Sequence, residues 1–585
     1  MNRYTLFLKL KYVLYCAFFI VLPVQFRAFF VDKYLFYHTS TGAYGAIQSI
    51  LNDAIIIFGI LLLVYLSLVL KRHAIIKYLF RLFAFLIVCV YVADIFIVYN
   101  FSTHLIVADV IKYGAYAGKY IYQIYGIWIL MLIPLTVLTI SLIIFDLDKV
   151  VIHHKRRHLA FWSIMLILFI AYCFRDNSRY VHSWIYKNVI DYNLSIRSQS
   201  ADYSKAFMSN TPIPDEGVIC FSSKPQKKNI IILMVESLSS YHSHFFSGIK
   251  DWTPHLDIIA EQNVSFTNFY ANGYNTEDGY IAVLTGLLPI SAPSYWSNDG
   301  RVFFEGFMDI SASLPNIAKS HGYRTAFLTA GELIGFGDGQ WAESIGFDYI
   351  EGSNHPYYAG WKKFHFQSIP DEALLNRVLT IALDRKNRPF LLFVSTLSSH
   401  HPFMNPENNR RSEQEVIRYV DKQIGRFYNE LKQSDFFSSG MLIITADHHA
   451  MVPLKEAEIK KFGAIRAPAR IPLIISYGDK HKQVENRAFQ QTDIYNSLKN
   501  YLNDEKCVSR WLGDLITHPT VPPVFIGHKR GEERSLISIF HGSDDILVKL
   551  NGDNTKVLSP SVIGSNIANE VLNKINYERI ARQKN

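Results

Sequence analysis

The sequence predicts a helical membrane domain followed by an α/β domain with a small antiparallel sheet at its C-terminal end. Three observations support this fold class. Within the first 175 of the 585 residues, Ile, Leu, Val, Phe and Tyr form apolar runs of about 20 residues, the length of a bilayer span. From residue 229, continuous apolar runs typical of buried parallel strands alternate with helical patterns. From about residue 528, short strands separated by turn residues indicate an antiparallel sheet.

Five apolar segments are predicted to cross a membrane. They cover residues 10–31, 47–70, 79–99, 124–145 and 159–175. Basic residues concentrate before the first span, between the second and third, and between the fourth and fifth. Because basic loops stay in the cytoplasm, we expect the N-terminus inside and everything after about residue 176 outside. Asp53 and Asp94 lie within or beside spans, where either a structural role or a polar path is open.

Charge and cysteine content narrow the classes of function. The net charge of +9 does not indicate a nucleic-acid partner, because many basic residues flank the apolar spans. There are five cysteines and no CxxC pair, so neither a cysteine-based zinc site nor a disulfide framework is indicated. Cys220 and Cys507 lie outside the apolar spans, and they either pair in an oxidising compartment or remain free thiols.

The composition divides the chain into four parts. We expect a transmembrane domain of five helices over 1–175, a linker over 176–228, a catalytic α/β domain over 229–527 and a small β/α subdomain over 528–585. The linker is expected to be irregular, because three prolines interrupt it. The predicted strands of the α/β domain are 229–235, 325–329, 390–396, 441–445 and 471–475, and the predicted helices are 255–262, 313–322, 370–386 and 413–433.

The loop Asn272–Tyr280 precedes an apolar run and is predicted to open a helix. Asn275 or Thr276 can cap this helix, and Glu277 and Asp278 then fall in its first turn. A hydroxyl at this place lies over backbone N–H groups at the positive end of a helix dipole, where a phosphate or a metal-bound alkoxide is stabilised. An ordinary capping threonine is the alternative interpretation.

Polar side chains follow three of the predicted strands. In chain order they are Glu236, His400, His401, Asp447, His448 and His449. Because ligands of open α/β sheets gather at the carboxyl ends of the strands, we expect these side chains and Thr276 to form one site. Carboxylates, imidazoles and an alkoxide suit Mn²⁺, Mg²⁺ or Zn²⁺, and such a metal would lower the pKa of the hydroxyl and neutralise charge on a phosphoryl group.

The order and spacing of these motifs resemble the lipoteichoic acid synthase type of phosphoglycerol transferase, in the sulfatase-like branch of the alkaline phosphatase superfamily. The matching motifs are Val-Glu-Ser at 235–237, Thr-Pro-His-Leu at 253–256, Thr276, Ile-Gly-Phe-Asp at 345–348, Leu-Ser-Ser-His-His-Pro-Phe at 397–403 and Thr-Ala-Asp-His at 445–448. The resemblance spans most of 229–500, and it implies an alkaline-phosphatase-like, or sulfatase-like, α/β domain.

The resemblance also implies roles for individual residues. Thr276 would be the nucleophile, and one divalent metal ion, Mn²⁺ first with Mg²⁺ or Zn²⁺ as alternatives, would bind to Glu236, Thr276, Asp447 and His448. His400 matches a histidine that contacts the substrate phosphate. His401 and His449 are either part of the site or hydrogen-bonded neighbours of it. If His401 is part of the site, we expect it to contact the substrate.

One segment departs from the family pattern. In lipoteichoic acid synthases, a Trp and an Arg contact the glycerol phosphate just upstream of the segment that resembles Ser344–Asp348. Here Phe336 and Asp338 lie in that region, and Asp338 stands where the Arg is expected. Both are therefore candidate substrate-binding residues. An acid at this place makes a pocket for a cationic ethanolamine group an alternative to one for glycerol.

The resemblance implies a reaction in which a phosphoglycerol-type headgroup moves from a phospholipid to a cell-envelope glycan through a covalent intermediate on Thr276. The expected donor is phosphatidylglycerol first and phosphatidylethanolamine second, and the acceptor is a glycan or a lipid-linked molecule. We expect a multi-pass protein of the bacterial cytoplasmic (inner) membrane with a periplasmic or extracellular catalytic domain.

Three alternatives to this function stay open. They are a phosphoethanolamine transferase, a phosphodiesterase or hydrolase of the same superfamily, and a scaffold that carries an inactive domain. Sulfatase chemistry itself is disfavoured, because the sequence has no C/S-x-P-x-R motif in which a formylglycine could form.

Overall fold

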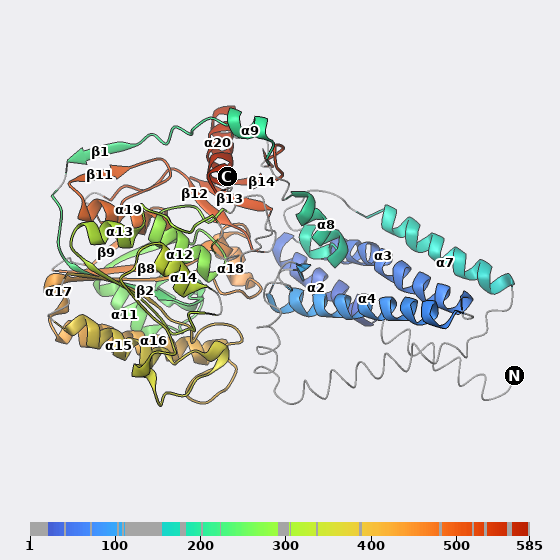
Figure 1. Ribbon diagram of the computed structural model, residues 1–585, viewed down its shortest axis with the longest axis horizontal. Helices are drawn as coiled ribbons and strands as arrows, with labels where there is room; N and C mark the ends of the chain where they lie inside the picture. The colour runs from blue at the N-terminus through green and yellow to red at the C-terminus, as the bar shows by residue number, and fades with distance from the viewer. Residues whose placement is uncertain are drawn as a thin grey trace. The chain divides into compact units, whose positions relative to one another are not determined.

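The chain forms two compact units, Met1–Arg197 and Ser198–Asn585 (Figure 1). The structure is a computed structural model. It describes residues 22–39, 42–70, 73–101, 104–107, 110, 155–175, 183–199, 203–222, 224–290, 304, 306–334, 337–384, 389–478, 482–516, 520–531, 535–558 and 564–582.

Two described helices of the first unit are long and apolar enough to cross a bilayer. They are α3 (Gly42–Val69) and α4 (Ala74–Phe101), whose most apolar windows have mean hydropathies of 2.3 and 2.6. The helix α2 (Leu22–Thr39) contains Arg27, Asp32 and Lys33, and the apolar part of α7 (Lys155–Cys173) is shorter than a bilayer span. The predicted span 124–145 and residues 10–21 of the predicted span 10–31 lie outside the described residues. Five spans are therefore not confirmed.

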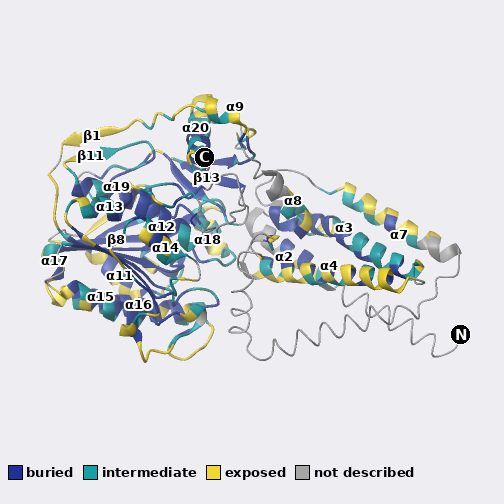
Figure 2. Cartoon of the chain, viewed as in Figure 1, coloured by how far each residue is buried: buried dark blue, intermediate teal, exposed yellow. Residues whose placement is uncertain are grey.

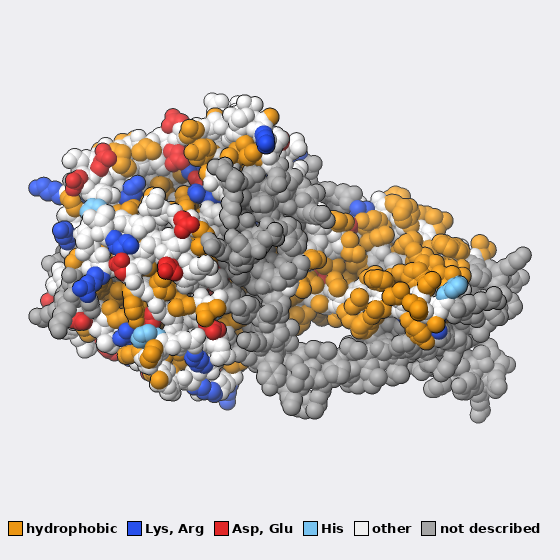
Figure 3. All heavy atoms as spheres, in the orientation of Figure 1, with side chains coloured by type: hydrophobic (Ala, Val, Ile, Leu, Met, Phe, Trp, Pro, Cys, Tyr) orange, Lys and Arg blue, Asp and Glu red, His pale blue; other side chains and the backbone are white. Residues whose placement is uncertain are grey.

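Large apolar side chains cover the outside of α4 and α7. Ile75 is 78% exposed, Leu159 70% and Ile167 64%. Figure 2 shows these helices with many exposed residues, and Figure 3 shows hydrophobic side chains over most of the described surface of the first unit. An apolar surface of this extent favours contact with lipid over contact with water.

Buried polar pairs hold the helices of the first unit together. Asp53 forms an ion pair with Arg27 of α2 and accepts a hydrogen bond of 2.7 Å from the Tyr91 hydroxyl of α4. Asp94 lies 3.0 Å from Nδ1 of His104. Because both carboxylates are satisfied inside the unit, the structure favours the structural role expected for Asp53 and Asp94 over an open polar path.

A nine-stranded sheet forms the centre of the second unit. Its main path runs β10-β3-β8-β7-β2-β6-β4-β5, and β9 (Gln483–Glu485) pairs with β3 at one edge. The strands are β2 (Asn229–Val235), β3 (Val264–Tyr270), β4 (Arg324–Thr329), β5 (Tyr349–Glu351), β6 (Phe390–Ser395), β7 (Gly440–Ala446), β8 (Arg470–Tyr477) and β10 (Phe489–Gln490). Among these described strands, β8 alone runs in the direction opposite to the others.

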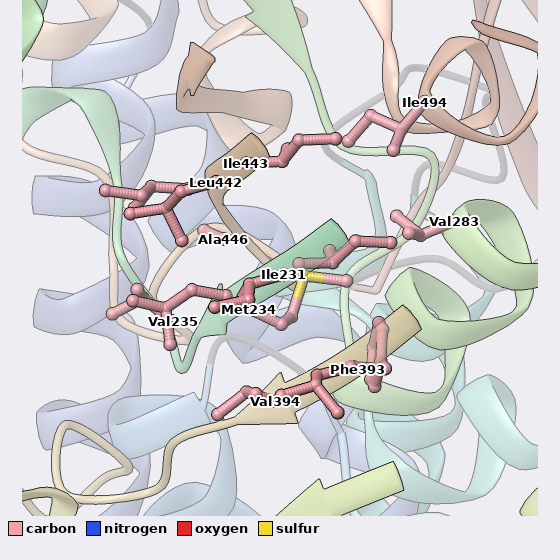
Figure 4. Close-up of a cluster of buried hydrophobic side chains, with 14 of the residues drawn as sticks. Ile231, Met234, Val235, Val283, Phe393, Val394, Leu442, Ile443, Ala446 and Ile494 are labelled. Atoms are coloured by element: carbon pink, nitrogen blue, oxygen red, sulfur yellow. The ribbon is translucent and has the colours of Figure 1, made fainter. Parts of the chain in front are cut away.

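The predicted strands correspond to β2, β4, β6, β7 and β8. Apolar residues dominate all of them except β4, whose apolar part is only 326–328, and β2, β6 and β7 are buried along their whole length. Figure 4 shows side chains of these three strands, among them Ile231, Phe393 and Ile443, packed together with Val283 of α12 (Thr276–Thr285). The sequence analysis missed β3, because Thr267 and Asn268 interrupt its apolar pattern.

Two groups of helices flank this sheet on opposite sides in Figure 1. One group is α11 (Pro254–Gln262), α15 (Asp371–Leu383) and α16 (Glu413–Gln433), and the other is α12, α13 (Leu314–Ser320) and α19 (Gln491–Leu502). The sequence predicted α11, α13, α15 and α16 to within a few residues. The predicted α/β domain with helices on both faces of the sheet is confirmed.

The region expected to be an irregular linker contains regular elements. The helix α8 (Val189–Gln199) lies in the first unit except for its last residues, and α9 (Lys205–Asn210) and β1 (Ile219–Ser222) belong to the second. Strand β1 pairs antiparallel with β11 (Glu505–Val508), and a disulfide joins Cys220 to Cys507 across the pair. Of the two states expected for these cysteines, the structure contains the paired one.

The predicted small antiparallel sheet is confirmed. It consists of β12 (Ile526–Lys529), β13 (Leu536–His541), β14 (Asp544–Lys549) and β15 (Lys556–Val557). The helix α20 (Ser565–Ala581) packs on it through Val571 and Ile575, which share a core with Ile537 and Val548. This sheet begins at residue 526, two residues before the predicted boundary.

Candidate functional site

Two carboxylates lie side by side at the carboxyl edge of the main sheet. Glu236 follows β2 and Asp447 follows β7, and these strands pair in parallel with Val235 opposite Ala446. The register therefore places both acids at the same level. Both are almost completely buried, with exposed fractions of 1% for Glu236 and 0% for Asp447.

The helix α12 brings Thr276 to these acids. Asn275 is the capping residue, because its side chain accepts a hydrogen bond of 3.0 Å from the backbone N–H of Asp278. Thr276 is then the first residue of the helix. One turn on, a Cβ at Gly279 would lie 2.6 Å from the carbonyl oxygen of Asp447, so only glycine allows the helix to approach so closely.

Four of the predicted site residues come together. Thr276 Oγ1 lies 3.3 Å from Glu236 Oε2 and 3.5 Å from His448 Nε2. His448 Nε2 in turn lies 3.3 Å from Asp447 Oδ2 and 3.6 Å from Glu236 Oε1. Ligand atoms of Glu236, Asp447 and His448 all lie within 4.8 Å of one another.

Hydrogen bonds fix the orientation of these side chains. His448 Nδ1 lies 2.7 Å from the carbonyl oxygen of His449 and donates to it, which directs Nε2 toward the acids, where its lone pair could bind a metal. Asp447 Oδ1 accepts from the backbone N–H groups of Ser237 and His448, both at 2.8 Å. Asp447 Oδ2 is buried and has no hydrogen-bond partner among the described residues.

This arrangement fits a divalent metal ion. Burial, and after it the charge of Asp447, raises the pKa of Glu236 well above its usual range. Two buried carboxylates and an unsatisfied oxygen are costly unless a cation compensates them. Two carboxylates, one imidazole nitrogen and one hydroxyl are also the donor types that Mn²⁺, Mg²⁺ and Zn²⁺ accept.

His400 lies beside this cluster. Burial lowers its pKa to about 4, and His448 lowers it further, whereas the hydrogen bond to the His401 carbonyl and the charge of Asp447 partly oppose this shift. Its Nδ1 is 2.5 Å from the carbonyl oxygen of His401, and its ring packs edge-on against Phe366. The unbound ring is therefore neutral at neutral pH.

The other two histidines have different surroundings. Burial lowers the pKa of His401 to about 4 as well; His400 and Arg411 act in the same direction, and Glu413 opposes them. His449 Nε2 lies 2.7 Å from Glu458 Oε2, and its Nδ1 lies 2.8 Å from the carbonyl oxygen of Ala450. His449 is thus a hydrogen-bonded neighbour of the site, one of the two expected alternatives.

Asp338 lies near the first turn of α12. It begins α14 (Asp338–Ser344), and its pKa is raised to about 8 by burial and then by the charge of Glu277. Because Glu277 directly follows Thr276, Asp338 lies close to the candidate site, as the sequence predicted for an acid in this segment. Phe336, the other predicted contact in this segment, lies outside the described residues.

The sequence analysis missed a polar cluster next to the site. Glu413, at the start of α16, accepts hydrogen bonds from the Tyr241 hydroxyl and, at 3.2 Å, from His242 Nε2, and it lies 3.5 Å from Lys455 Nζ. Burial alone would raise the pKa of Glu413, but His242, Lys455 and Tyr241 lower it to about 2. These residues come from three separate segments, and none of them belongs to a motif.

The sequence analysis also missed a buried amide side chain that connects the Asp447 turn with the Thr276 loop. Gln491, the first residue of α19, donates hydrogen bonds to the carbonyl oxygens of Ala446, at 2.8 Å, and Asp447, at 2.7 Å. Its Oε1 accepts from the backbone N–H of Asn272 at 2.9 Å. One buried side chain therefore connects the turn that carries Asp447 with the loop that carries Thr276.

The α/β domain has relatives among known proteins. Residues 228–503 match the family model described as Sulfatase. Phosphoglycerol transferase I of Xanthomonas campestris pv. campestris is 26% identical over 246 residues, which are 39% of this chain and 34% of that protein. Phosphoglycerol transferase I of Escherichia coli (strain 55989 / EAEC) is 24% identical over 277 residues, 44% of this chain and 35% of that protein. The match thus spans about a third of these relatives.

A solved structure supports the fold. The protein of the alkaline phosphatase superfamily from Vibrio parahaemolyticus aligns with a TM-score of 0.51 and 20% identity. The alignment covers 66% of this chain and 95% of that protein. At this identity the likeness shows the fold of the α/β unit.

We predict that Gln491→Ala destabilises the α/β unit by about 1–3 kcal/mol, because it leaves buried backbone groups of Asn272, Ala446 and Asp447 unpaired. Denaturant unfolding should show a lower midpoint with an unchanged slope. Gln433→Ala, at the exposed end of α16, is the matched control and should stay within about 0.5 kcal/mol of the wild type. Equal stability of the two variants would contradict the role of Gln491.

Proposed function

Since residues 228–503 form a sulfatase-family domain of the alkaline phosphatase superfamily that resembles phosphoglycerol transferase I, we propose that this chain is a metal-dependent phosphotransferase. It moves a phosphoglycerol-type headgroup from a phospholipid to a cell-envelope glycan through a covalent intermediate on Thr276. The observation that carries this proposal is the position of the Thr276 hydroxyl, 3.3 Å from Glu236 and 3.5 Å from His448 at the start of a helix.

Glu236, Thr276, Asp447 and His448 would hold one divalent ion, for which we propose Mn²⁺ first and Mg²⁺ or Zn²⁺ as alternatives. When bound, it would supply positive charge that lowers the pKa of the hydroxyl and offsets the charge on the phosphoryl group. The buried Asp447 Oδ2, which lacks a hydrogen-bond partner among the described residues, supports this assignment.

The reaction has two displacement steps. In the first, the Thr276 oxygen forms a bond to the headgroup phosphorus while the bond from phosphorus to the diacylglycerol oxygen breaks, and diacylglycerol leaves with a proton. In the second, the oxygen of an acceptor hydroxyl displaces Thr276 from the phosphorus, and Thr276 regains a proton. The N–H groups of the first turn of α12 favour the negative charge that gathers at the phosphoryl group.

His400 is the proposed contact to the phosphate. Its Nδ1 is engaged by the His401 carbonyl, so only Nε2 can reach a substrate. A nearby phosphate would raise the pKa of the ring from about 4 and favour the doubly protonated form that donates to it. His401, Phe336 and Asp338 remain proposed substrate contacts.

The proposed donor is a membrane lipid, phosphatidylglycerol first and phosphatidylethanolamine second, and the acceptor is a glycan or a lipid-linked molecule. The two long apolar helices α3 and α4 support a place in the bacterial inner membrane. We propose a multi-pass chain with a cytoplasmic N-terminus and a periplasmic or extracellular catalytic domain, because basic residues concentrate in alternate loops. A membrane anchor raises the effective concentration of a lipid donor at the site.

Asp338 favours a second candidate, transfer of phosphoethanolamine. Burial and the charge of Glu277 raise the pKa of Asp338 to about 8, so its carboxyl is largely neutral before a substrate binds. A cationic headgroup beside it would lower this pKa and pair with the charged form. A hydrolase would use the same residues, with water in place of the acceptor hydroxyl.

Replacing the nucleophile provides the first test. Wild-type protein in detergent should release diacylglycerol from phosphatidylglycerol or phosphatidylethanolamine, each labelled in the headgroup. Thr276→Ala should lower this rate by at least about 1,000-fold, because the attacking oxygen is gone, and Thr276→Ser should retain activity. The control Thr380→Ala alters an exposed threonine of α15 and should leave the rate unchanged. Release from neither lipid, or a wild-type rate in folded Thr276→Ala, would refute the proposal.

Metal removal provides the second test. Chelation should abolish activity, and added Mn²⁺, Mg²⁺ or Zn²⁺ should restore it. Asp447→Asn should reduce the metal content measured by elemental analysis, because it removes one of the two buried negative charges. Full activity in protein shown to be free of metal would contradict the assignment.

A further inference from the structure

The small C-terminal sheet reaches the loop that carries Thr276. Along β12, the backbone N–H of Lys529 donates to the carbonyl oxygen of Asn272 at 2.8 Å. The Asn272 side chain donates to the carbonyl oxygen of Gly527 at 2.7 Å, and His528 Nδ1 lies 2.9 Å from the carbonyl oxygen of Ala271. The start of the loop is therefore bonded to the edge of a sheet that contributes no residue to the candidate metal site.

One ion pair extends this contact to the helix itself. Lys529 Nζ lies 2.8 Å from Asp278 Oδ1, and the side chains are 20% and 4% exposed. Asp278 stands two residues after Thr276 in the first turn of α12. Because a buried carboxylate without a compensating charge is costly, Lys529 stabilises this turn in its observed place.

Asp278 also closes the loop. Its Oδ2 accepts from the backbone N–H of Tyr274 at 3.2 Å, and its own backbone N–H donates to the Asn275 side chain at 3.0 Å. The Lys529 ammonium lies 5.7 Å from the centre of the Tyr274 ring. The loop is tight: a Cβ at Gly273 would lie 2.2 Å from the Cβ of Asp278. A displacement of Asp278 would therefore shift the whole segment that presents the Thr276 hydroxyl.

We propose that Lys529 is a positioning residue for the nucleophile and that the small C-terminal sheet thereby takes part in forming the active site. The Lys529–Asp278 pair holds the 272–278 loop and the first turn of α12 against β12. Its effect on the rate rests on the function proposed above, whereas its effect on the loop does not. Lys529 acts through Asp278, and it touches neither the candidate metal ligands nor Thr276 in the contacts that the structure describes.

Hydrogen exchange and kinetics of the full chain test this proposal together. In Lys529→Met, amide exchange of peptides covering 272–279 should rise about tenfold or more, since the bond from the Tyr274 N–H depends on a fixed Asp278. The kcat for diacylglycerol release should fall by roughly 10- to 100-fold with little change in KM, because a nucleophile that is misplaced slows the chemical step. Lys529→Arg keeps the charge and should recover most of the native protection from exchange and most of the native kcat.

Lys556→Met is the matched control, because Lys556 is an exposed lysine of the same small sheet. It should change neither the exchange nor kcat. If Lys529→Met does not fold, Asp278→Asn replaces it, because the carboxamide keeps the shape and its oxygen can still accept from the Tyr274 N–H, whereas the charge that pairs with Lys529 is lost. Native exchange and native kcat in the folded Lys529 or Asp278 variant would overturn the proposal. An inactive wild type whose loop still loosens in Lys529→Met would refute the proposed function and leave the positioning role standing.

Discussion

The burial of Glu236 and Asp447 next to each other is the constraint on which the rest of this site depends. Parallel pairing of β2 and β7 puts the two carboxylates at one level, and neither has access to water. Their mutual repulsion must be offset, and the surrounding groups are arranged to do so. Backbone N–H groups satisfy Asp447 Oδ1, and Ser237 donates to Glu236. His448 turns its Nε2 toward the same place, where it adds an atom that can bind a metal. What remains is a place for a cation beside a hydroxyl.

The position of that hydroxyl depends on contacts between distant parts of the chain. Gly279 lets α12 approach the Asp447 carbonyl, and Gln491 bonds to both the Asp447 turn and the Thr276 loop. Strand β12 is hydrogen-bonded to the start of the same loop. Such a site is assembled only when the main sheet, α19 and the small sheet have all folded. The chemistry near Thr276 and the packing of the C-terminal part are therefore linked.

Local patterns predicted much of this architecture, because they are properties of short segments. An apolar strand followed at once by an acid identified Glu236 and Asp447, and a capped helix start identified Thr276. Strand β3 was missed because polar residues interrupt it. Gln491 and Lys529 were missed because each acts on residues far away in the sequence and neither carries a local signal. The five predicted spans are not confirmed, because the described residues contain two helices that are long and apolar enough, and residues 10–21 and 124–145 lie outside the described part of the chain.

The central claim is that Thr276 itself carries the transferred group, and mass spectrometry of the protein tests it most directly. Wild-type protein would be incubated with headgroup-labelled phospholipid without acceptor, quenched in acid and digested. The account predicts labelled headgroup phosphate on the peptide that contains Thr276, and its absence from Thr276→Ala. Turnover of the lipid by wild-type protein with the Thr276 peptide unmodified, or with the label on another residue, would contradict the account.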